Sequence, residues 1–205
     1  MHISEGVLSG PVLISGMAMA AAGTAIGLKK LDFDRIGQAG ILSASFFVAS
    51  LVHVPLGPSN VHLIMNGMVG LLLGWSAFPA ILVALLLQAI LFQYGGITTL
   101  GVNTVIMAVP AIMGHYLFRT VVRIKPQAIL PAAFIAGLMG VFLAGCLAAL
   151  ALISASENFI EAAILLATAH LPIMIIEGII TAFCVAFLRK VQPGMIPVAT
   201  GEKHS

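Results

Sequence analysis

Residues Ile129–Ile153 read ILPAAFIAGLMGVFLAGCLAALALI and contain no charged side chain. A helix needs about 20 consecutive apolar residues to cross the hydrocarbon core of a bilayer, so this stretch alone predicts a transmembrane helix. The rest of the 205-residue chain is similar, because 60% of it is hydrophobic and only 8% is charged, whereas a soluble domain carries about 25% charged residues. The sequence therefore predicts an all-α, polytopic membrane protein.

Glycine, proline and charged residues divide the chain into seven apolar stretches, and we therefore expect about seven transmembrane helices. The third and fourth stretches are short and only Trp75–Ala77 separates them, so they either tilt or form a hairpin that does not cross the membrane fully. No linker or internal repeat is evident, which predicts one transmembrane domain over residues 1–191 and a short cytoplasmic tail over residues 192–205. The seven stretches are Val7–Leu28, Gly37–Val54, Val61–Trp75, Phe78–Phe92, Val102–Val122, Ile129–Ile153 and Phe159–Leu188.

The positive charges predict the orientation of this bundle. All nine Lys and Arg residues lie between the first and second stretches, from the end of the fifth to the start of the sixth, or after the seventh. Because Lys and Arg are concentrated in cytoplasmic loops, seven spans place the N-terminus outside and the C-terminus in the cytoplasm. The outer side then gathers His, Asn and carboxylate side chains, as a surface that receives cations would. The net charge of +2 is small and basic runs interleaved with aromatic residues are absent, which argues against a nucleic-acid partner.

The first two residues, Met1 and His2, can chelate a metal. The first basic residue is Lys29, so the positive region of a cleaved signal peptide is missing, and we expect Met1 to be retained because His2 is too large for methionine removal. The α-amine, the His2 backbone nitrogen and His2 Nδ1 can then close two chelate rings in one plane, which suits Ni²⁺ and Cu²⁺, and Co²⁺ less strictly. Zn²⁺ prefers a tetrahedron, and Ca²⁺ and Mg²⁺ prefer oxygen. Many proteins begin with Met-His by chance, so the pair needs support from other residues.

A second histidine could complete the plane. The segment Pro55–His62 reads PLGPSNVH, and its Pro and Gly residues should end the second apolar stretch. We expect Ser59 or Asn60 to cap the next helix, so that His62 lies in its first turn as a fourth ligand facing inward. The alternative is a histidine hydrogen-bonded at the membrane interface. His53, at the end of the preceding stretch, ranks below His62 as a ligand.

Polar backbone also occurs at membrane depth in Gly95–Asn103, which reads GGITTLGVN. Such a segment is tolerated only where it is buried in protein or lines a cavity. Thr98 or Thr99 could cap the fifth span, and Asn103 could orient a ligating histidine. The alternative is a tight outer turn.

The last apolar stretch contains His170-Leu-Pro-Ile-Met-Ile-Ile-Glu177. Pro172 should bend this helix because it removes a backbone hydrogen bond, and His170 and Glu177 share one helix face. Ionisable groups inside a bilayer suggest a function, so we expect His170 to support the metal ligands. Glu177 lies deeper, and the alternative role for it is pairing within the bundle. For His115 we expect only a polar contact.

Enzymatic motifs are absent from this sequence. It has no GxSxG elbow, no HExxH pair and no phosphate loop ending in Gly-Lys-Ser/Thr. Cys146 and Cys184 lie in apolar runs and form no CxxC pair, so we expect them to act as small core hydrophobes. We therefore expect a protein that is not an enzyme.

Four segments together carry a family resemblance. They are the MHIxEG start at Met1–Gly6, SNVHL at Ser59–Leu63, FQYGGITTLGVN at Phe92–Asn103 and HLPxxxxEG at His170–Gly178. They resemble the CbiM/NikM family, the membrane substrate-capture subunits (S components) of energy-coupling-factor cobalt and nickel importers. The resemblance runs from Met1 to about Arg189, and the glycine-threonine stretch combined with the Met-His start is its most specific part.

This resemblance implies a fold similar to the vitamin-capturing S components, with an extra N-terminal helix, so that residues 1–191 form one transmembrane metal-capture domain. It implies Co²⁺ or Ni²⁺ as the transported substrate, bound by the α-amine of Met1, the backbone and ring nitrogens of His2, and His62. Its implied partners are a transmembrane coupling (T) subunit, ATPase subunits and, often, a small accessory membrane protein, in a bacterial or archaeal cell (inner) membrane. The candidates for supporting the ligands or closing over them are Glu5, Asn60, Thr98, Thr99, Asn103 and His170.

Two departures from the family pattern accompany the resemblance. Glu5 stands where many members carry Asp, and the chain stops after Gln192–Ser205, where some members continue into an accessory region. Overall likeness favours cobalt, and a nickel-specific subunit of the same system is the alternative. A stand-alone metal transporter or channel is a further alternative, although it should show polar residues along its whole path, whereas mid-membrane polar groups are essentially His115 and Glu177.

Overall fold

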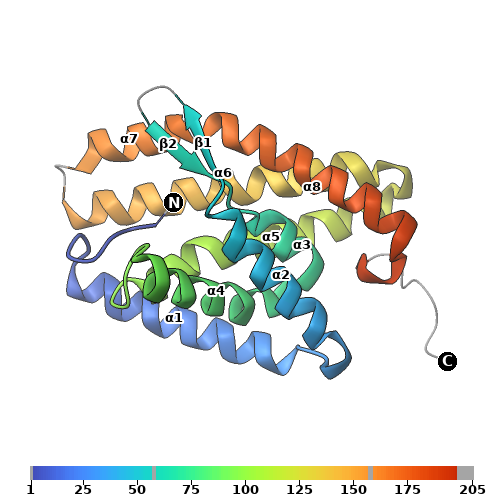
Figure 1. Cartoon of the computed structure of the whole chain (residues 1–205), viewed down its shortest axis with the longest axis horizontal. Helices are drawn as coiled ribbons and strands as arrows, with labels where there is room; N and C mark the ends of the chain where they lie inside the picture. The colour runs from blue at the N-terminus through green and yellow to red at the C-terminus, as the bar shows by residue number, and fades with distance from the viewer. Residues whose placement is uncertain (1, 57–58, 157–158, 198–205) are drawn as a thin grey trace.

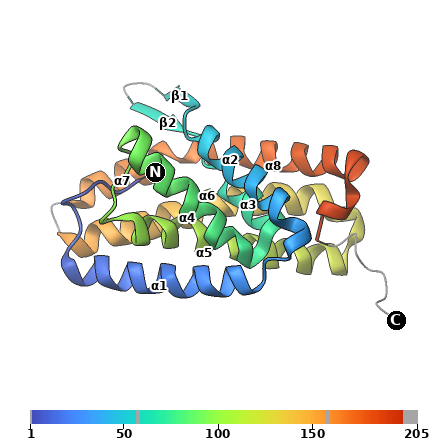
Figure 2. The same cartoon turned by 60° about the horizontal axis from the view of Figure 1, so that its bottom comes forward.

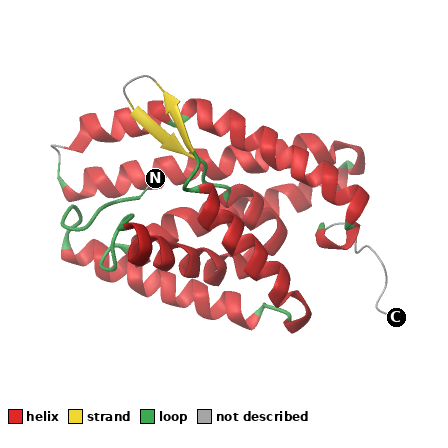
Figure 3. Cartoon of the chain, in the orientation of Figure 1, coloured by secondary structure: helices red, strands yellow, loops and turns green. Residues whose placement is uncertain are grey.

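The computed structural model describes residues 2–56, 59–156 and 159–197, without the side chains of residues 53–56, 59–61, 163, 166 and 167. Its helices lie roughly side by side, and one two-stranded hairpin projects from them (Figures 1 and 3). The helices are α1 Gly10–Lys29, α2 Ile36–Ala49, α3 Asn66–Leu73, α4 Ala77–Phe92, α5 Leu100–Ile124, α6 Ile129–Ala155, α7 Ile160–Ala169 and α8 Leu171–Val191, the strands are β1 His53–Leu56 and β2 Ser59–His62, and short 3₁₀ turns occupy η1 Phe33–Arg35, η2 Gly74–Ser76, η3 Pro126–Ala128 and η5 Pro193–Met195.

The outer surface of this bundle is apolar, as a bilayer requires. Large side chains such as Ile14 and Phe183 are 74% and 72% exposed, which lipid tails would tolerate and water would not. Within the described residues, five helical stretches are long and apolar enough to cross a membrane: Gly10–Lys29, Asn66–Phe92, Leu100–Ile124, Pro126–Ala155 and Leu171–Val191. The prediction of a polytopic, all-α membrane protein is confirmed, with the hairpin as its only β element in the described part of the chain.

The third apolar stretch does not form a full helix. Helix α3 has 8 residues, which at 1.5 Å per residue span about 12 Å, less than half of a hydrocarbon core of about 30 Å. One turn, η2, separates it from α4. The predicted start of this helix at Ser59 or Asn60 is wrong, since these residues pair in β2 with β1, in a register that sets His53 opposite His62.

Helix α3 therefore begins inside the bundle, and Glu177 of α8 satisfies its first backbone groups. The Glu177 carboxylate accepts hydrogen bonds from the amides of Ile64 and Met65, and Glu177 is fully buried. Met65 has φ of 58°, a left-handed conformation that turns the extended chain into the helix. The interpretation of Glu177 as a group paired within the bundle is confirmed.

The last apolar stretch is divided, as Pro172 predicts. Helix α7 ends at Ala169 and α8 begins at Leu171, with the proline in the first turn of α8, where its missing N–H is not needed. His170 occupies the junction.

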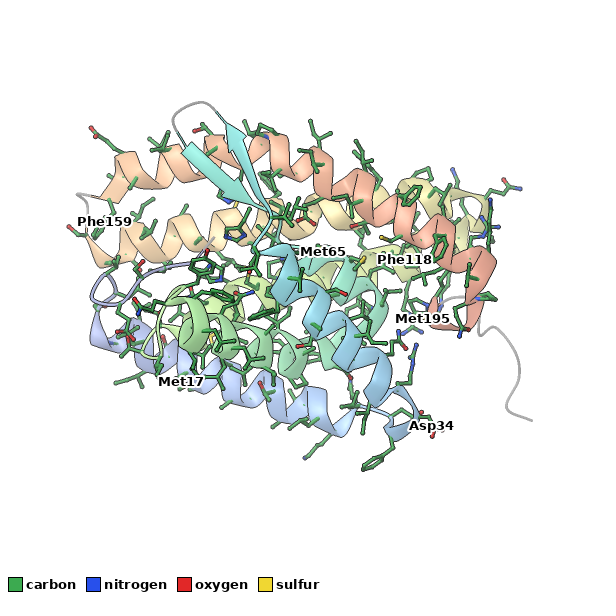
Figure 4. The ribbon with its side chains drawn as sticks, in the orientation of Figure 1. Met17, Asp34, Met65, Phe118, Phe159 and Met195 are labelled. Atoms are coloured by element: carbon green, nitrogen blue, oxygen red, sulfur yellow. The ribbon has the colours of Figure 1, made fainter. Side chains whose placement is uncertain are left out.

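Helix α5 runs through the middle of the molecule, with α1 on one side of it and α6 and α8 on the other (Figure 2). Several contacts are close because one partner is glycine: Gly70 of α3 lies on the backbone of α5 at Ala111, and Gly67 of α3 lies on Gly137 and Gly140 of α6. Helices α1, α5 and α8 end, and α6 begins, at the same end of the bundle. We call this the basic end. Asp34 and Met195 mark it in Figure 4, and the described segment before α1 and the strands β1 and β2 lie towards the other end.

The close packing of α3 makes a stability prediction. A β-carbon at Gly70 would overlap with the Ala111 backbone, whereas one at Gly40 of α2 would meet nothing within 4 Å. Gly70→Ala should therefore destabilise the protein by about 1–3 kcal/mol, as overpacking does, and Gly40→Ala should be neutral or slightly stabilising through helix propensity. Thermal unfolding in detergent measures both, and equal shifts would show that α3 and α5 do not approach this closely.

Candidate metal site

Asn103 of α5 holds the N-terminal segment against the bundle. The Ile3 amide donates to Asn103 Oδ1 at 3.0 Å, and Asn103 Nδ2 donates to the Ile3 carbonyl at 3.1 Å and to Thr99 Oγ1 at 3.2 Å. One side-chain amide thus serves both backbone groups of Ile3, as a neighbouring β-strand would. Ile3 is buried, so this residue of the chain preceding α1 belongs to the core. Asn103 contacts Ile3, the residue beside His2. The expectation that Asn103 orients a histidine therefore remains a prediction.

The loop between α4 and α5 packs on the same segment. Glu5 Oε1 accepts a hydrogen bond from the Thr98 amide at 3.2 Å. Gly95 has φ of 75°, and a β-carbon at Gly96 would overlap with the Glu5 side chain, so two glycines are needed for this approach. Thr99 occupies the N-cap position of α5, but its hydroxyl bonds Gly96 O and provides no side-chain cap.

His2 is fixed by Gln88, a residue that the sequence analysis did not single out. His2 Nε2 lies 2.8 Å from Gln88 Oε1, and Gln88 Nε2 donates to the Phe47 carbonyl at 3.5 Å. With Gln88 Oε1 facing His2 Nε2, the neutral His2 ring donates its proton from Nε2. His2 Nδ1 then keeps its lone pair. Gln88 is fully buried and is the one polar residue of α4, a signal that could have identified it.

His62 forms its hydrogen bond through Nδ1, whereas His2 forms its hydrogen bond through Nε2. It lies at the end of β2, four residues before α3, and not in the first turn of a helix as expected. Its Nδ1 lies 2.9 Å from the Leu63 carbonyl, which can only accept, so Nδ1 carries the proton and Nε2 keeps its lone pair. The rings of His2 and His62 have centroids 5.2 Å apart.

Both rings are neutral and partly shielded. Burial lowers the pKa of His2 to about 3 and that of His62 to about 3, so at neutral pH each ring is uncharged. Tyr94 packs on His2 with a ring-centroid distance of 5.9 Å. His170 is buried at the start of α8 and close enough to contribute to the lowering of the His62 pKa.

The described side chains supply only part of a metal-binding set. Within the described ranges, no three or more His, Cys, Asp or Glu side chains are grouped for one ion. The two imidazoles of His2 and His62 are the ligand-type side chains that the described residues bring together here. Met1 lies outside the described residues, as do the side chains of Asn60 and His53.

Comparison with known proteins identifies the family. Residues 2–195 match the family CbiM, described as the cobalt uptake substrate-specific transmembrane region. The chain belongs to the CbiM family. It therefore belongs to a family of multi-pass, substrate-specific membrane components of cobalt uptake, which is a transport family.

Relatives of this CbiM-family chain extend along its length. It is 44% identical over 198 residues to a Haemophilus influenzae protein named for metal transport, covering 94% of this chain and 95% of that protein. It is 29% identical over 213 residues to the cobalt transport protein CbiM of Sorangium cellulosum, covering 96% and 94%. A fused nickel transport protein, NikMN of Rhodobacter capsulatus, is 39% identical over 115 residues, which is 53% of this chain and 33% of the fusion.

A solved structure is similar in fold. The crystal structure of a truncated transition metal transporter matches with a TM-score of 0.81 and 27% identity, over 93% of this chain and 99% of that one.

Removing the Asn103 contact should release the N-terminal segment. In Asn103→Leu the Ile3 amide and carbonyl lose their buried partner, so hydrogen exchange at the Ile3 amide should become at least about tenfold faster, as loss of one hydrogen bond of roughly 1.4 kcal/mol predicts. Exchange measured by mass spectrometry checks this. Thr104→Val is the matched control, because the Thr104 hydroxyl bonds only the Leu100 carbonyl of its own helix. Equal exchange in both variants would contradict the role of Asn103.

Proposed function

We propose that this CbiM-family protein captures Co²⁺ or Ni²⁺ with four nitrogens. They are the α-amine of Met1, the backbone nitrogen of His2, His2 Nδ1 and His62 Nε2. The observation that carries the proposal is the pairing of two neutral imidazoles whose hydrogen bonds to Gln88 and Leu63 leave these two ring nitrogens unprotonated. The first three nitrogens belong to one short stretch of chain, so only His62 must be brought in from elsewhere.

The distance between the rings agrees with a shared ion. With metal–nitrogen bonds of about 2.0–2.1 Å, two imidazoles on one metal have centroids roughly 4.5 Å apart in neighbouring positions and roughly 6.4 Å apart in opposite positions. In the proposed plane the α-amine lies opposite His2 Nδ1, so His62 takes a neighbouring position, and the observed 5.2 Å is somewhat longer than that position requires. A small rotation of either ring would complete the coordination.

The choice of nitrogen favours the proposed metals. Planar nitrogen coordination suits Ni²⁺ and accommodates Co²⁺, whereas Ca²⁺ and Mg²⁺ require oxygen ligands. Binding would displace a proton from the α-amine and from the His2 amide, so affinity should rise with pH. We propose cobalt as the first candidate, following the overall likeness to CbiM proteins, with nickel as the alternative.

We further propose that the chain works as the S component of an energy-coupling-factor importer. A transmembrane coupling (T) subunit and ATPase subunits would supply the energy, and a small accessory membrane protein would complete the complex. The fusion of this region to a second component in NikMN supports at least one membrane partner. The distribution of Lys and Arg supports an orientation with the histidine site outside and the basic end in the cytoplasm.

Moving the α-amine away from His2 should abolish binding. Three alanines inserted after Met1 break the chelate, and three are used because a single alanine would create a new chelate between the amine and a third-position histidine. With the untagged, purified protein, isothermal titration with Ni²⁺ and Co²⁺ should show a loss larger than the roughly 10–100-fold that changes outside the ligand set cost. The same alanines added after Ser205 are the control. Stoichiometric binding in the Met1 insertion variant would refute the chelate.

The two paired histidines of the hairpin should differ in importance. His62→Ala removes the fourth nitrogen and should weaken metal binding by far more than His53→Ala, although the two residues are register partners in β1 and β2. The same titration measures both variants. Equal losses would mean that the hairpin, and not His62 as a ligand, determines affinity.

A further inference from the structure

A cavity of about 490 Å³ lies at the basic end, away from the histidine site. Three cationic side chains line it, each from a different part of the fold: Lys30 follows α1, Arg35 ends η1 and Arg119 lies on α5. No carboxylate of the described residues lines the cavity. With a water molecule occupying about 30 Å³, the space is large enough for a polar group and its hydration.

The hydrogen-bonding groups of this cavity are mostly donors. Trp75 Nε1 donates to the Tyr116 hydroxyl at 3.0 Å, which leaves the Tyr116 O–H to donate elsewhere. Lys30 Nζ lies 5.3 Å from the Trp75 ring centroid and has no carboxylate partner within the described part of the chain. Arg35 uses Nε for Gln38 and retains its terminal N–H groups. Three positive charges and a hydroxyl donor around one space fit an anion with several oxygens, and guanidinium groups bind phosphate in two-pronged fashion.

An apolar groove of about 410 Å³ adjoins the cavity at Trp75, which lines both. The groove lies between α1 and α5, over Ala22, Ile26 and Val109, and its surface is almost entirely apolar. Ile26 and Met19 are exposed here on a membrane-facing helix. A cationic cavity that continues into an apolar groove matches the two parts of an acidic phospholipid, its charged headgroup and its acyl chains.

We propose that the basic cavity binds the phosphate of an acidic glycerophospholipid and that the α1–α5 groove receives one of its acyl chains. The juxtaposition of Lys30, Arg35 and Arg119 with the groove is what carries the assignment. Basic pockets between transmembrane helices bind anionic headgroups elsewhere, and Trp and Tyr concentrate where headgroups meet acyl chains. The bound lipid would neutralise cations that otherwise repel one another. This site is independent of metal capture at the other end.

The test uses the full-length chain in nanodiscs that contain phosphatidylcholine and phosphatidylglycerol in equal amounts, followed by native mass spectrometry of the retained lipid. The wild type should retain phosphatidylglycerol at least about tenfold over phosphatidylcholine. The double variant Lys30→Gln/Arg119→Gln should lose most of this preference. The matched control Arg123→Gln/Lys190→Gln removes the same charges at the same end, outside the cavity lining, and should keep it. Unchanged Ni²⁺ binding in both variants would verify that they fold.

A groove variant separates lipid from soluble anion. Ala22→Phe, which fills the groove without touching the cations, should reduce retention of phosphatidylglycerol. Inorganic phosphate at millimolar concentration should not displace the lipid from the wild type. Equal losses in the cavity and control variants would overturn the proposal. It would also be overturned if phosphate bound while phosphatidylglycerol showed no preference, since the cavity would then serve a soluble anion. Loss of a co-produced coupling subunit from Lys30→Gln/Arg119→Gln, with lipid retention unchanged, would assign the cavity to an acidic protein partner instead.

Discussion

Peptide groups that leave a helix inside a bilayer must find hydrogen-bond partners within the protein, because lipid offers none. Two segments of this chain do so, and both carry a histidine. The N-terminal segment finds its partner in Asn103, whose amide bonds both backbone groups of Ile3. The segment that precedes α3 finds its partner in Glu177, which accepts from the amides of Ile64 and Met65. The candidate metal site lies between these two irregular segments, so its geometry depends on two buried polar side chains that are not themselves proposed as ligands.

The placement of the ring protons follows from the same constraint. Gln88 is buried in an otherwise apolar helix and presents an oxygen to His2. The Leu63 carbonyl does the same for His62. Each imidazole is held in one tautomer, which would reduce the reorganisation that the proposed metal binding requires.

The sequence predicted the helical membrane architecture well, because long uncharged runs such as Ile129–Ile153 leave few alternatives. It failed at Val61–Trp75, since a short apolar run does not distinguish a buried extended segment from a helix. The break at Pro172 could be predicted because proline acts locally. The contact of Gln88 with His2 and the partner of Glu177 could not, because these contacts join residues 86 and 113 positions apart. Chelate chemistry and sequence likeness both drew attention to His2 and His62, but the hydrogen bonds of their rings required coordinates.

These long separations also order events during synthesis. The partner of Ile3 lies 100 residues downstream, and the carboxylate that steadies the chain beside His62 belongs to the last long helix. The first residues of the nascent chain therefore cannot pack on Asn103 until α4 and α5 have left the ribosome. The segment after the hairpin cannot bond Glu177 until α8 is inserted. Chains that end before α5 would lack the Asn103 anchor of Ile3, and chains that end before α8 would lack the Glu177 anchor of the segment beside His62.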